Sequence, residues 1–274
     1  MDQALAADVL ERLGIADARA ATSDLDSLRR IYAAWCEGVP FDNVRKMIHL
    51  ADRPGGPLPG STTEDFFAAW LEHGTGGTCW AGNGALHDLL AAVGLEVERA
   101  IATMLPRADI VGPNHGSVVV TVDGQRWIAD ASILSGEPLR ITAPDGPTPG
   151  GDLPRLEWRD GKPNVIWRMP SAPGGFPCRF ERIGVDPVEW VALHQRTAGG
   201  GPFNTALSAR VLRGSTSVGF AAGQRFAFDA AGNLTIEERD RAGRDRFLIE
   251  ELGISAAIVA GLPPDRPIDL PTPE

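Results

Sequence analysis

The hydrophobic period of this 274-residue chain changes near Gly94. Up to that point apolar residues recur three or four positions apart, as at Leu25, Leu28 and Ile31, which is the spacing of one face of an α-helix. Beyond it, apolar and polar residues alternate over short runs, which is typical of β-strands. Helices followed by strands that are joined by tight turns such as Asp123-Gly124 predict an α+β fold, and argue against an all-parallel, doubly wound sheet.

The same patterns place the individual elements. Helices are expected at 4–13, 25–35, 64–72, 79–94, 186–196 and 245–252. Strands are expected at 95–105, 117–122, 125–131, 137–142, 178–182, 206–213, 217–221, 224–228 and 233–238. Ser23 or Asp24 is expected to cap the second helix, and Thr63 the third. Residues 144–177 hold eight prolines, which predicts either a long irregular connection or a linker with short strands at 155–158 and 164–168.

Composition excludes several classes of protein. A hydrophobic fraction of 43% argues against general disorder. The chain has 26 Lys and Arg against 36 Asp and Glu, a net charge of −10, so it lacks the basic footprint that nucleic-acid binding needs. Its sequence has no apolar run of roughly 18 residues and no signal-like start, so we expect a cytoplasmic protein without a membrane partner. Three cysteines without a CxxC pair predict neither disulfides nor a metal site.

One of the three cysteines follows a glycine-rich turn. Cys79 comes after Gly74-Thr75-Gly76-Gly77-Thr78 and begins the fourth expected helix. The unpaired N–H groups and the positive end of the helix dipole favour a thiolate there, and glycines let a substrate approach the sulfur. Cys36 lies within an apolar helix and Cys178 has no such approach. Cys79 is therefore the candidate nucleophile.

A candidate base and its orienting partner lie on one hairpin. The Asp123-Gly124 turn pairs Val122 with Gln125, and this register makes His115 and Asp130 diagonal neighbours on one face. The other face carries Val118, Val120, Val122, Trp127, Ala129 and Ala131, and is predicted to pack on the core. Alternatively, His115 is a solvated loop residue and Asp130 pairs with Arg126. A cysteine, a histidine and a carboxylate together form the usual apparatus of nucleophilic acyl transfer.

These residues resemble the arylamine N-acetyltransferase family. The likeness rests on Gly76-Gly77-Thr78-Cys79 with Asn83, followed by the His–strand–turn–strand–Asp unit. It continues in Pro40-Phe41-Asp42-Asn43-Val44, which is similar to the family's Pro-Phe-Glu-Asn-Leu segment. Gly201-Pro202-Phe203 resembles its Ser-Pro-Phe segment, and residues 247–254 resemble its closing helix. The matches fall in order over roughly residues 25–255.

The resemblance implies three parts: a helical domain at 1–94, an antiparallel β-barrel at 95–200 and an α/β lid at 201–274. It implies that Cys79, His115 and Asp130 form a catalytic triad on a transglutaminase-like core. The family moves an acyl group from coenzyme A to a small amine or hydroxylamine, and some relatives form amides from an acyl carrier protein. Acetyl-CoA or another acyl thioester is thus the expected co-substrate, with no permanently bound cofactor.

By the same resemblance, the donor site is expected between barrel and lid. Phe41 and Phe203 would line the acyl pocket, or would be ordinary core aromatics. Arg45 and Lys46 are the basic residues nearest the first of these segments, placed either to meet the phosphates of coenzyme A or to lie in solvent.

The chain departs from the family pattern close to the nucleophile. Thr75 and Ala81 stand where the family has an arginine and a glutamate, and residues 131–136 replace its glycine-rich run after the aspartate. These changes favour specialised, biosynthetic substrates over simple arylamines. A transglutaminase-like or peptidase-like Cys-His-Asp enzyme is the alternative, because Gly77-Thr78-Cys79-Trp80 fits that group too. A catalytically silent binding homologue is a third reading.

Overall fold

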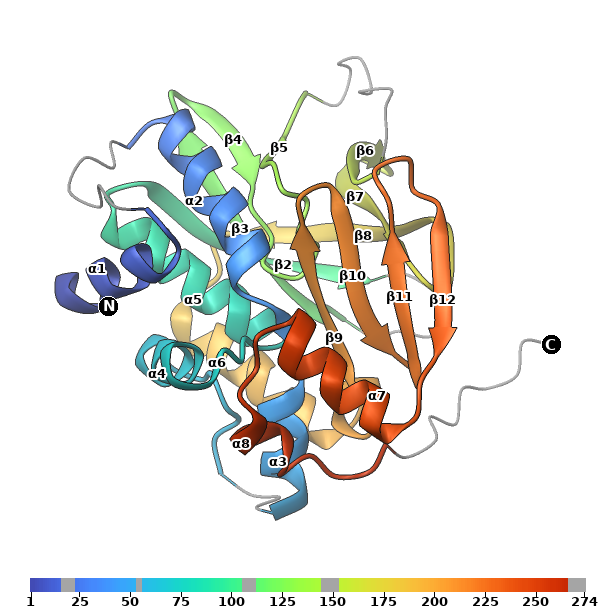
Figure 1. Ribbon diagram of the computed structural model, residues 1–274. Coiled ribbons are helices and arrows are strands. Elements are labelled where there is room, and N and C mark those ends of the chain that lie inside the picture. Colours follow the sequence, from blue (N-terminus) through green and yellow to red (C-terminus); the bar gives the residue numbers. More distant parts are fainter. Residues whose placement is uncertain (16–22, 53–55, 105–111, 144–152, 266–274) are drawn as a thin grey trace.

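The computed structural model describes residues 1–15, 23–52, 56–104, 112–143 and 153–265. In Figure 1, helices gather at the left around one sheet, and a second sheet stands at the right with the C-terminal helices below and in front of it. The helices are α1 (Gln3–Arg12), α2 (Leu25–Gly38), α3 (Val44–Asp52), α4 (Thr63–His73), α5 (Cys79–Ala92), α6 (Pro187–Arg196), α7 (Arg241–Arg246) and α8 (Ala256–Val259). None of these described helices is long and apolar enough to cross a lipid bilayer.

The first part of the chain is helical, as its period predicts. Asp24 caps α2 by accepting the N–H of Ser27 at 2.8 Å, and the apolar face of α2 is buried. Thr62, not Thr63, caps α4, because the Thr63 hydroxyl is hydrogen-bonded to Asp88 instead. The sequence patterns did not predict α3 or the two-residue strand β1 (Phe41–Asp42), since both are short and held mainly by contacts with distant residues.

The middle of the chain forms a seven-stranded antiparallel sheet with the order β5-β4-β3-β2-β8-β7-β6. Its strands are β2 (Glu96–Met104), β3 (His115–Val122), β4 (Gln125–Ile128), β5 (Leu139–Arg140), β6 (Arg155–Arg159), β7 (Lys162–Met169) and β8 (Ala172–Ile183). The two edge strands, β5 and β6, come into contact, so the sheet is a nearly closed barrel. The predicted sequence of helices, antiparallel barrel and mixed C-terminal part is confirmed.

The proline-rich stretch follows the second of its two predictions. The short strands expected at 155–158 and 164–168 are β6 and β7, whereas β8 begins at Ala172, earlier than expected, and residues 144–152 lie outside the described part. Pro163 and Pro177 lie within β7 and β8 themselves. Pairing along the rest of these strands is extensive, so single missing donors are tolerated.

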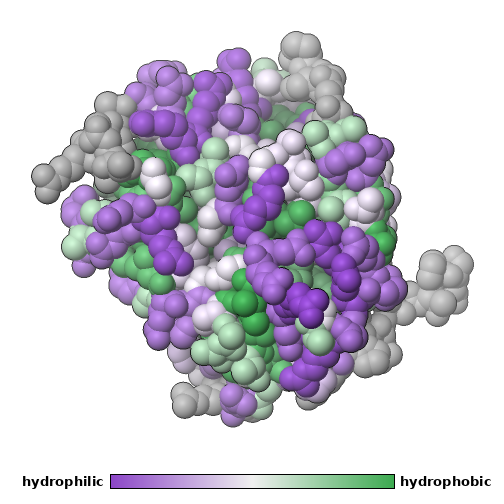
Figure 2. Space-filling view, viewed as in Figure 1, coloured by the Kyte–Doolittle hydropathy of each residue, from purple (hydrophilic) through white to green (hydrophobic). Residues whose placement is uncertain are grey.

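A five-stranded antiparallel sheet, with the order β1-β9-β10-β11-β12, forms the right side of Figure 1. It contains β9 (Ser208–Arg213), β10 (Thr216–Ala221), β11 (Gln224–Phe228) and β12 (Leu234–Glu238). Hydrophilic side chains cover most of this face of the molecule in Figure 2, with hydrophobic residues confined to narrow stretches between them. Because β1 belongs to this sheet, residues 41–42 of the helical part pair with a strand of the expected lid.

Both faces of the β3–β4 hairpin are buried. Val118, Val120 and Val122 pack with the helices, as predicted. Val119 and Ile128, on the opposite face, belong to a second core inside the barrel. The sequence predicted the core face alone; closure of the sheet makes the opposite face of this hairpin an interior as well. His115 and Asp130 lie on that interior side and are buried.

Candidate active site

Cys79 is the first residue of α5, at the end of the glycine-rich turn. Its side chain is buried, with 7% of the residue exposed. The residue before it, Thr78, caps the helix through backbone geometry and makes no side-chain hydrogen bond to the helix start. The amides of the first turn therefore have no side-chain acceptor, and they surround the sulfur with partial positive charge.

The Pro40–Val44 segment holds the glycine turn in place. Phe41 forms a parallel β-bridge with Gly77, and the Asp42 N–H donates to the carbonyl of Gly77 at 3.2 Å. The Asp42 carboxylate accepts the N–H of Gly76 at 2.7 Å. A Cβ at Gly76 would collide with the carbonyl oxygen of Pro40, so this close approach requires glycine. Burial raises the pKa of Asp42 to about 6, against the lowering effect of these hydrogen bonds.

The β3–β4 hairpin brings His115 and Asp130 together. The ladder pairs Val122 with Gln125 and Val119 with Ile128, which is the predicted register. His115 Nε2 lies 2.7 Å from Asp130 Oδ2. The alternative pairing of Asp130 with Arg126 is not formed; the Arg126 guanidinium lies 3.4 Å from Glu98. With Nε2 engaged by the carboxylate, Nδ1 is the ring nitrogen left for Cys79, whose side chain contributes to the raised pKa of His115.

The second carboxylate oxygen of Asp130 is hydrogen-bonded to backbone N–H groups of the turn that follows it. Oδ1 accepts the N–H groups of Ser132 at 2.8 Å and Ile133 at 3.0 Å. The amide of Asn83 donates to the same oxygen at 3.3 Å and to the carbonyl of Gly116 at 2.7 Å. Since Asn83 lies one turn after Cys79 on α5, it joins the nucleophile's helix to the strands that carry His115 and Asp130.

Tyr32 of α2 fixes the backbone at Asp130. Its hydroxyl donates to the Asp130 carbonyl at 2.9 Å and accepts the Asp130 N–H at 3.1 Å. It also lies 2.9 Å from the hydroxyl of Ser135. The helical period of residues 25–35 places Tyr32 on the apolar face of α2. A helical period cannot indicate which distant turn its hydroxyl contacts.

Burial and pairing set the charges of this cluster. Burial acts to lower the pKa of His115, but the Asp130 carboxylate and the Cys79 side chain outweigh it and raise the pKa to about 10. For Asp130, burial acts to raise the pKa, and the His115 charge with its hydrogen bond lowers it. The pair is therefore an imidazolium and a carboxylate at neutral pH, and an imidazolium next to the sulfur stabilises a thiolate.

The other two cysteines lie in different surroundings. Burial raises the pKa of Cys36 to about 12, and raises the pKa of Cys178 well above its usual range. Both thiols are therefore neutral at physiological pH and poor nucleophiles. Among the three, only Cys79 combines a helix start with a neighbouring histidine.

The two departures from the expected arginine and glutamate are both buried. Thr75 is fully enclosed, and its hydroxyl has no hydrogen-bond partner among the described residues. Ala81 packs so closely on Gly60 and Gly77 that a Cβ at either glycine would collide with its methyl group. Packing of Ala81 thus replaces the ion pair that an arginine and a glutamate would form at these two positions.

Phe41 and Phe203, the two residues expected at the acyl pocket, pack against each other. Their rings pack edge to face with centroids 5.4 Å apart. Asn43 holds the two segments together, because its amide donates to the carbonyls of Phe203 at 2.9 Å and Ala206 at 2.7 Å, and its oxygen accepts the N–H of Ser208 at 2.8 Å. The pair of rings therefore lies next to the Gly77 bridge and close to the start of α5.

The two basic residues next to this segment are both engaged. Arg45 pairs with Asp65 at 2.7 Å. Lys46 is buried, and its ammonium donates to the carbonyl oxygen of Thr197 at 3.1 Å and to the Thr197 hydroxyl at 2.9 Å. Burial lowers the pKa of Lys46 to about 8, against the opposing effect of Cys79. Lys46 was expected either to contact a phosphate or to lie in solvent; in the structure it is instead buried and hydrogen-bonded to Thr197.

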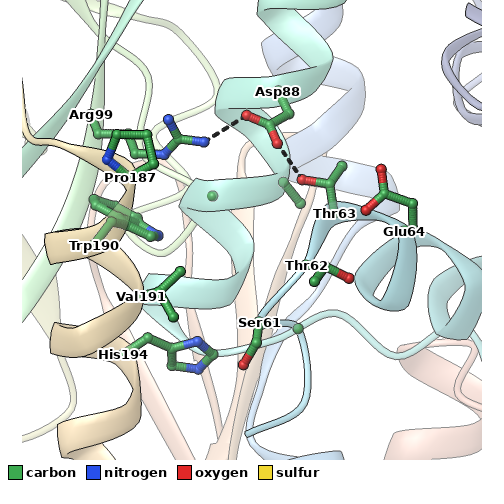
Figure 3. Close-up of a pocket in the computed structure, with 13 residues that line it drawn as sticks. Ser61, Thr62, Thr63, Glu64, Asp88, Arg99, Pro187, Trp190, Val191 and His194 are labelled. Carbon is green, nitrogen blue, oxygen red and sulfur yellow. Dashed lines mark hydrogen bonds and ion pairs between the residues drawn. The ribbon is translucent and has the colours of Figure 1, made fainter. Parts of the chain in front are cut away.

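Two cavities lie near the cluster. One, of about 420 Å³, separates the 133–137 turn from β9–β11 and is bounded on the barrel side by Trp167. The other, of about 180 Å³, lies between α4, α5 and α6 (Figure 3). There Trp190, Val191 and His194 of α6 face Ser61 and the Thr63–Asp88–Arg99 chain of polar contacts. Neither cavity is lined by Cys79, His115 or Asp130 themselves; the larger one is bordered by Ile133, three residues after Asp130.

Comparisons with known proteins agree with the residue pattern. A family model described as N-acetyltransferase matches residues 24–166, just over half of the chain. The arylamine N-acetyltransferase of Mycolicibacterium smegmatis is 32% identical over 130 residues, 44% of this chain and 45% of that protein. The match thus spans less than half the length of this curated relative.

Solved structures extend the likeness to almost the whole fold. The M. smegmatis arylamine N-acetyltransferase structure matches with a TM-score of 0.76 and 21% identity, over 96% of this chain and 97% of that chain. The structure of Mycobacterium marinum arylamine N-acetyltransferase in complex with CoA matches with a TM-score of 0.74 and 19% identity, over 92% of this chain and 93% of that chain.

Proposed function

The chain belongs to the N-acetyltransferase family, and on that premise we propose that it transfers an acyl group from a thioester donor to an amine through an acyl-enzyme on Cys79. The observation that carries the proposal is the His115–Asp130 pair, with its 2.7 Å contact, placed next to a cysteine at the start of a helix. The relatives of similar fold are arylamine N-acetyltransferases, and one was solved with CoA.

In the first half of the reaction the Cys79 sulfur attacks the donor's thioester carbonyl. Because His115 is an imidazolium before the attack, the proton of the Cys79 thiol is already on its Nδ1, and Asp130 holds the ring in the required orientation through Nε2. The oxyanion that forms is stabilised by backbone N–H groups at the start of α5. The donor's C–S bond then breaks, and the released thiol takes a proton from His115.

In the second half an amine attacks the thioester on Cys79. His115 accepts the proton that the amine loses as its nitrogen becomes an amide, and the C–S bond to Cys79 breaks. The sulfur leaves as a thiolate beside the imidazolium, which restores the starting state. No cofactor takes part besides the acyl thioester itself, so acetyl-CoA or a related thioester acts as a co-substrate.

Substrate choice is proposed to differ from that of a simple arylamine acetyltransferase. Ile133 and Leu134 are buried in the turn where the family has glycines, and they form one wall of the larger cavity. Thr75 and Ala81 leave no charged brace beside the nucleophile. Both changes lie on the donor side and leave the Cys79–His115–Asp130 cluster intact, so they favour specialised donors and acceptors.

Two other functions use the same residues. A transglutaminase-like or peptidase-like enzyme would accept an amide substrate in place of a thioester, and a silent homologue would bind without reacting. The contact of Phe41 with Phe203 and the Asn43 hydrogen bonds favour the acyltransferase, because they assemble the two further segments of the family's pattern beside Cys79.

Intact-mass measurement of acyl transfer tests the proposal. Wild-type protein incubated with acetyl-CoA, or with an acyl-pantetheine that has the arm shared by CoA and carrier proteins, is expected to gain one acyl group and lose it when an amine is added. Cys79→Ala is expected to gain none, a fall in rate of at least about 10³-fold. Cys178→Ala, which removes another buried thiol, serves as the matched control and should still be acylated. An adduct that persists in Cys79→Ala contradicts the proposal.

A further inference from the structure

Arg210 of β9 reaches into the larger cavity between the barrel and the second sheet. Its guanidinium carbon lies 4.2 Å from the centroid of the Trp167 ring and 5.4 Å from that of Phe41. Arg210 is half-buried and lines the cavity of about 420 Å³ together with Trp167. It therefore contacts both the barrel wall and one of the two phenylalanines placed beside the nucleophile.

The charge of Arg210 has no anionic partner among the described residues. Its Nε is buried and makes no hydrogen bond, and no carboxylate there forms an ion pair with the guanidinium. Burial lowers the pKa of Arg210 to about 10, so the group remains charged at neutral pH. Stacking on Trp167 uses the flat face of the guanidinium and leaves its in-plane N–H groups free. The Asp130 charge acts on this half-buried cation through space but forms no ion pair with it, and such a cation is costly unless a ligand supplies a directly paired anion.

Strand register places this cation close to the nucleophile. Arg210 lies directly opposite Phe41 in the β1–β9 pair, so the two side chains share a face. Phe41 is in turn bridged to Gly77, two residues before Cys79. Two inter-strand spacings amount to roughly 10 Å between the Arg210 and Gly77 backbones, a gap that a long arginine side chain and a short acyl group together span.

The charges around the cavity indicate which anion fits. Glu37, Glu137 and Asp229 are exposed residues at its boundary, and the second arginine there, Arg168, donates to the carbonyl of Leu153 at 3.0 Å. A polyphosphate would approach all three carboxylates. A single carboxylate inside the cavity needs only Arg210, and the flat fork of the guanidinium matches its two oxygens.

We propose that Arg210 is a specificity residue of the acyl subsite and binds a carboxylate at the far end of the acyl group, so that the preferred donors are thioesters of short dicarboxylic acids. This inference rests on the proposed acyl transfer and names its donor class. The carboxylate takes no part in the reaction: the donor's C–S bond breaks, a thioester to Cys79 forms, and the free carboxylate stays paired with Arg210.

A matched pair of donors tests the inference. Succinyl-pantetheine and butyryl-pantetheine have four-carbon acyl groups that differ in a terminal carboxylate or methyl, and neither carries the phosphates of coenzyme A. The measurement is the single-turnover rate of Cys79 acylation, followed by intact mass. Wild type is expected to favour the succinyl donor by about 10-fold or more, the scale of a charge-assisted hydrogen bond. Arg210→Met should reverse the preference, Arg210→Lys should keep part of it, and Arg168→Met, the matched cavity control, should retain it.

Binding to Cys79→Ala separates this inference from the proposed function. Calorimetry on that variant, with and without Arg210→Met, measures donor preference without any chemistry. If wild type is never acylated but succinyl-pantetheine still binds through Arg210, acyl transfer fails and the carboxylate site stands. Equal affinity for both donors, or an equal loss of both in Arg210→Met, overturns the carboxylate site. So does a dependence on Arg210 confined to acidic acceptors, seen with 4-aminobenzoate but not 4-aminobenzamide.

Discussion

The Cys79–His115–Asp130 cluster and the cavity at Arg210 differ in how completely their charged side chains are paired. Both oxygens of Asp130 are occupied, by His115 and by the amides of the following turn, and Tyr32 holds its backbone. Arg210 stacks on rings and has no anionic partner. A fully paired cluster keeps its geometry without a ligand, whereas an unpaired buried charge is completed only by one. The comparison therefore supports the proposal that the first region performs the chemistry and the second selects the donor.

Replacing the carboxylate of the paired region is expected to have the largest effect. Asp130→Asn keeps the shape of the side chain but removes the charge that orients and stabilises the imidazolium. We expect kcat/KM for acyl transfer to fall by about 10⁴-fold, the loss found when asparagine replaces the acid of a Ser-His-Asp triad. Steady-state assay with any donor that acylates wild type measures it. Activity within a few-fold of wild type would mean that His115 needs no orienting partner.

The pH dependence of the free energy of unfolding tests the pairing of His115 with Asp130. The pKa of His115 is raised in the folded state to about 10, so between about 6.5 and 10 the folded protein binds more protons than the unfolded chain. The contribution of His115 to stability is therefore complete below about pH 6.5 and is lost as pH rises towards 10. Urea unfolding at pH 6.5 and 9.5 should show a larger loss for wild type than for His115→Gln. Parallel losses in the two proteins would contradict the pairing.

Removing one hydroxyl from the paired region should have a smaller effect. Tyr32→Phe leaves the backbone groups of Asp130 and the Ser135 hydroxyl without their buried partner. We expect a loss of about 1–3 kcal/mol in the free energy of unfolding, the cost of unsatisfied buried polar groups. The acyl-transfer rate should fall several-fold, because Asp130 is less firmly placed. Denaturant unfolding measures the first effect, and an unchanged midpoint would show that water replaces the hydroxyl.

The smallest expected effect concerns Leu134, which lines the cavity at Arg210. Leu134 has a left-handed backbone with φ of +53°, which favours glycine over other residues. Leu134→Ala and Leu134→Gly remove nearly the same buried side chain, but only glycine relieves the backbone. Leu134→Gly should therefore be more stable than Leu134→Ala by about 1 kcal/mol, the reverse of the usual order. Chemical denaturation of the two variants checks this, and an alanine variant of equal or greater stability would count against backbone strain there.

The hairpin of the active site could be predicted from sequence because its contacts are local. The Asp123-Gly124 turn sets the register, and a period of two then places His115 and Asp130 on one face. Cys79 was found in the same way, since a glycine-rich turn before an apolar helix marks a helix start. The likeness of separate segments to one family added Phe41 and Phe203, whose contact the structure contains.

The remaining parts depended on contacts between distant residues. Period and turn chemistry determined by themselves the order of most helices and strands, the hairpin register and the place of Cys79 at a helix start. Only the tertiary structure decided that Tyr32 reaches Asp130, that β1 joins the second sheet and that Arg210 meets Trp167. It also turned the second face of the hairpin into a barrel interior. The physical reason is that local patterns fix backbone direction within an element, whereas the partner of a buried polar group is chosen by how whole elements pack.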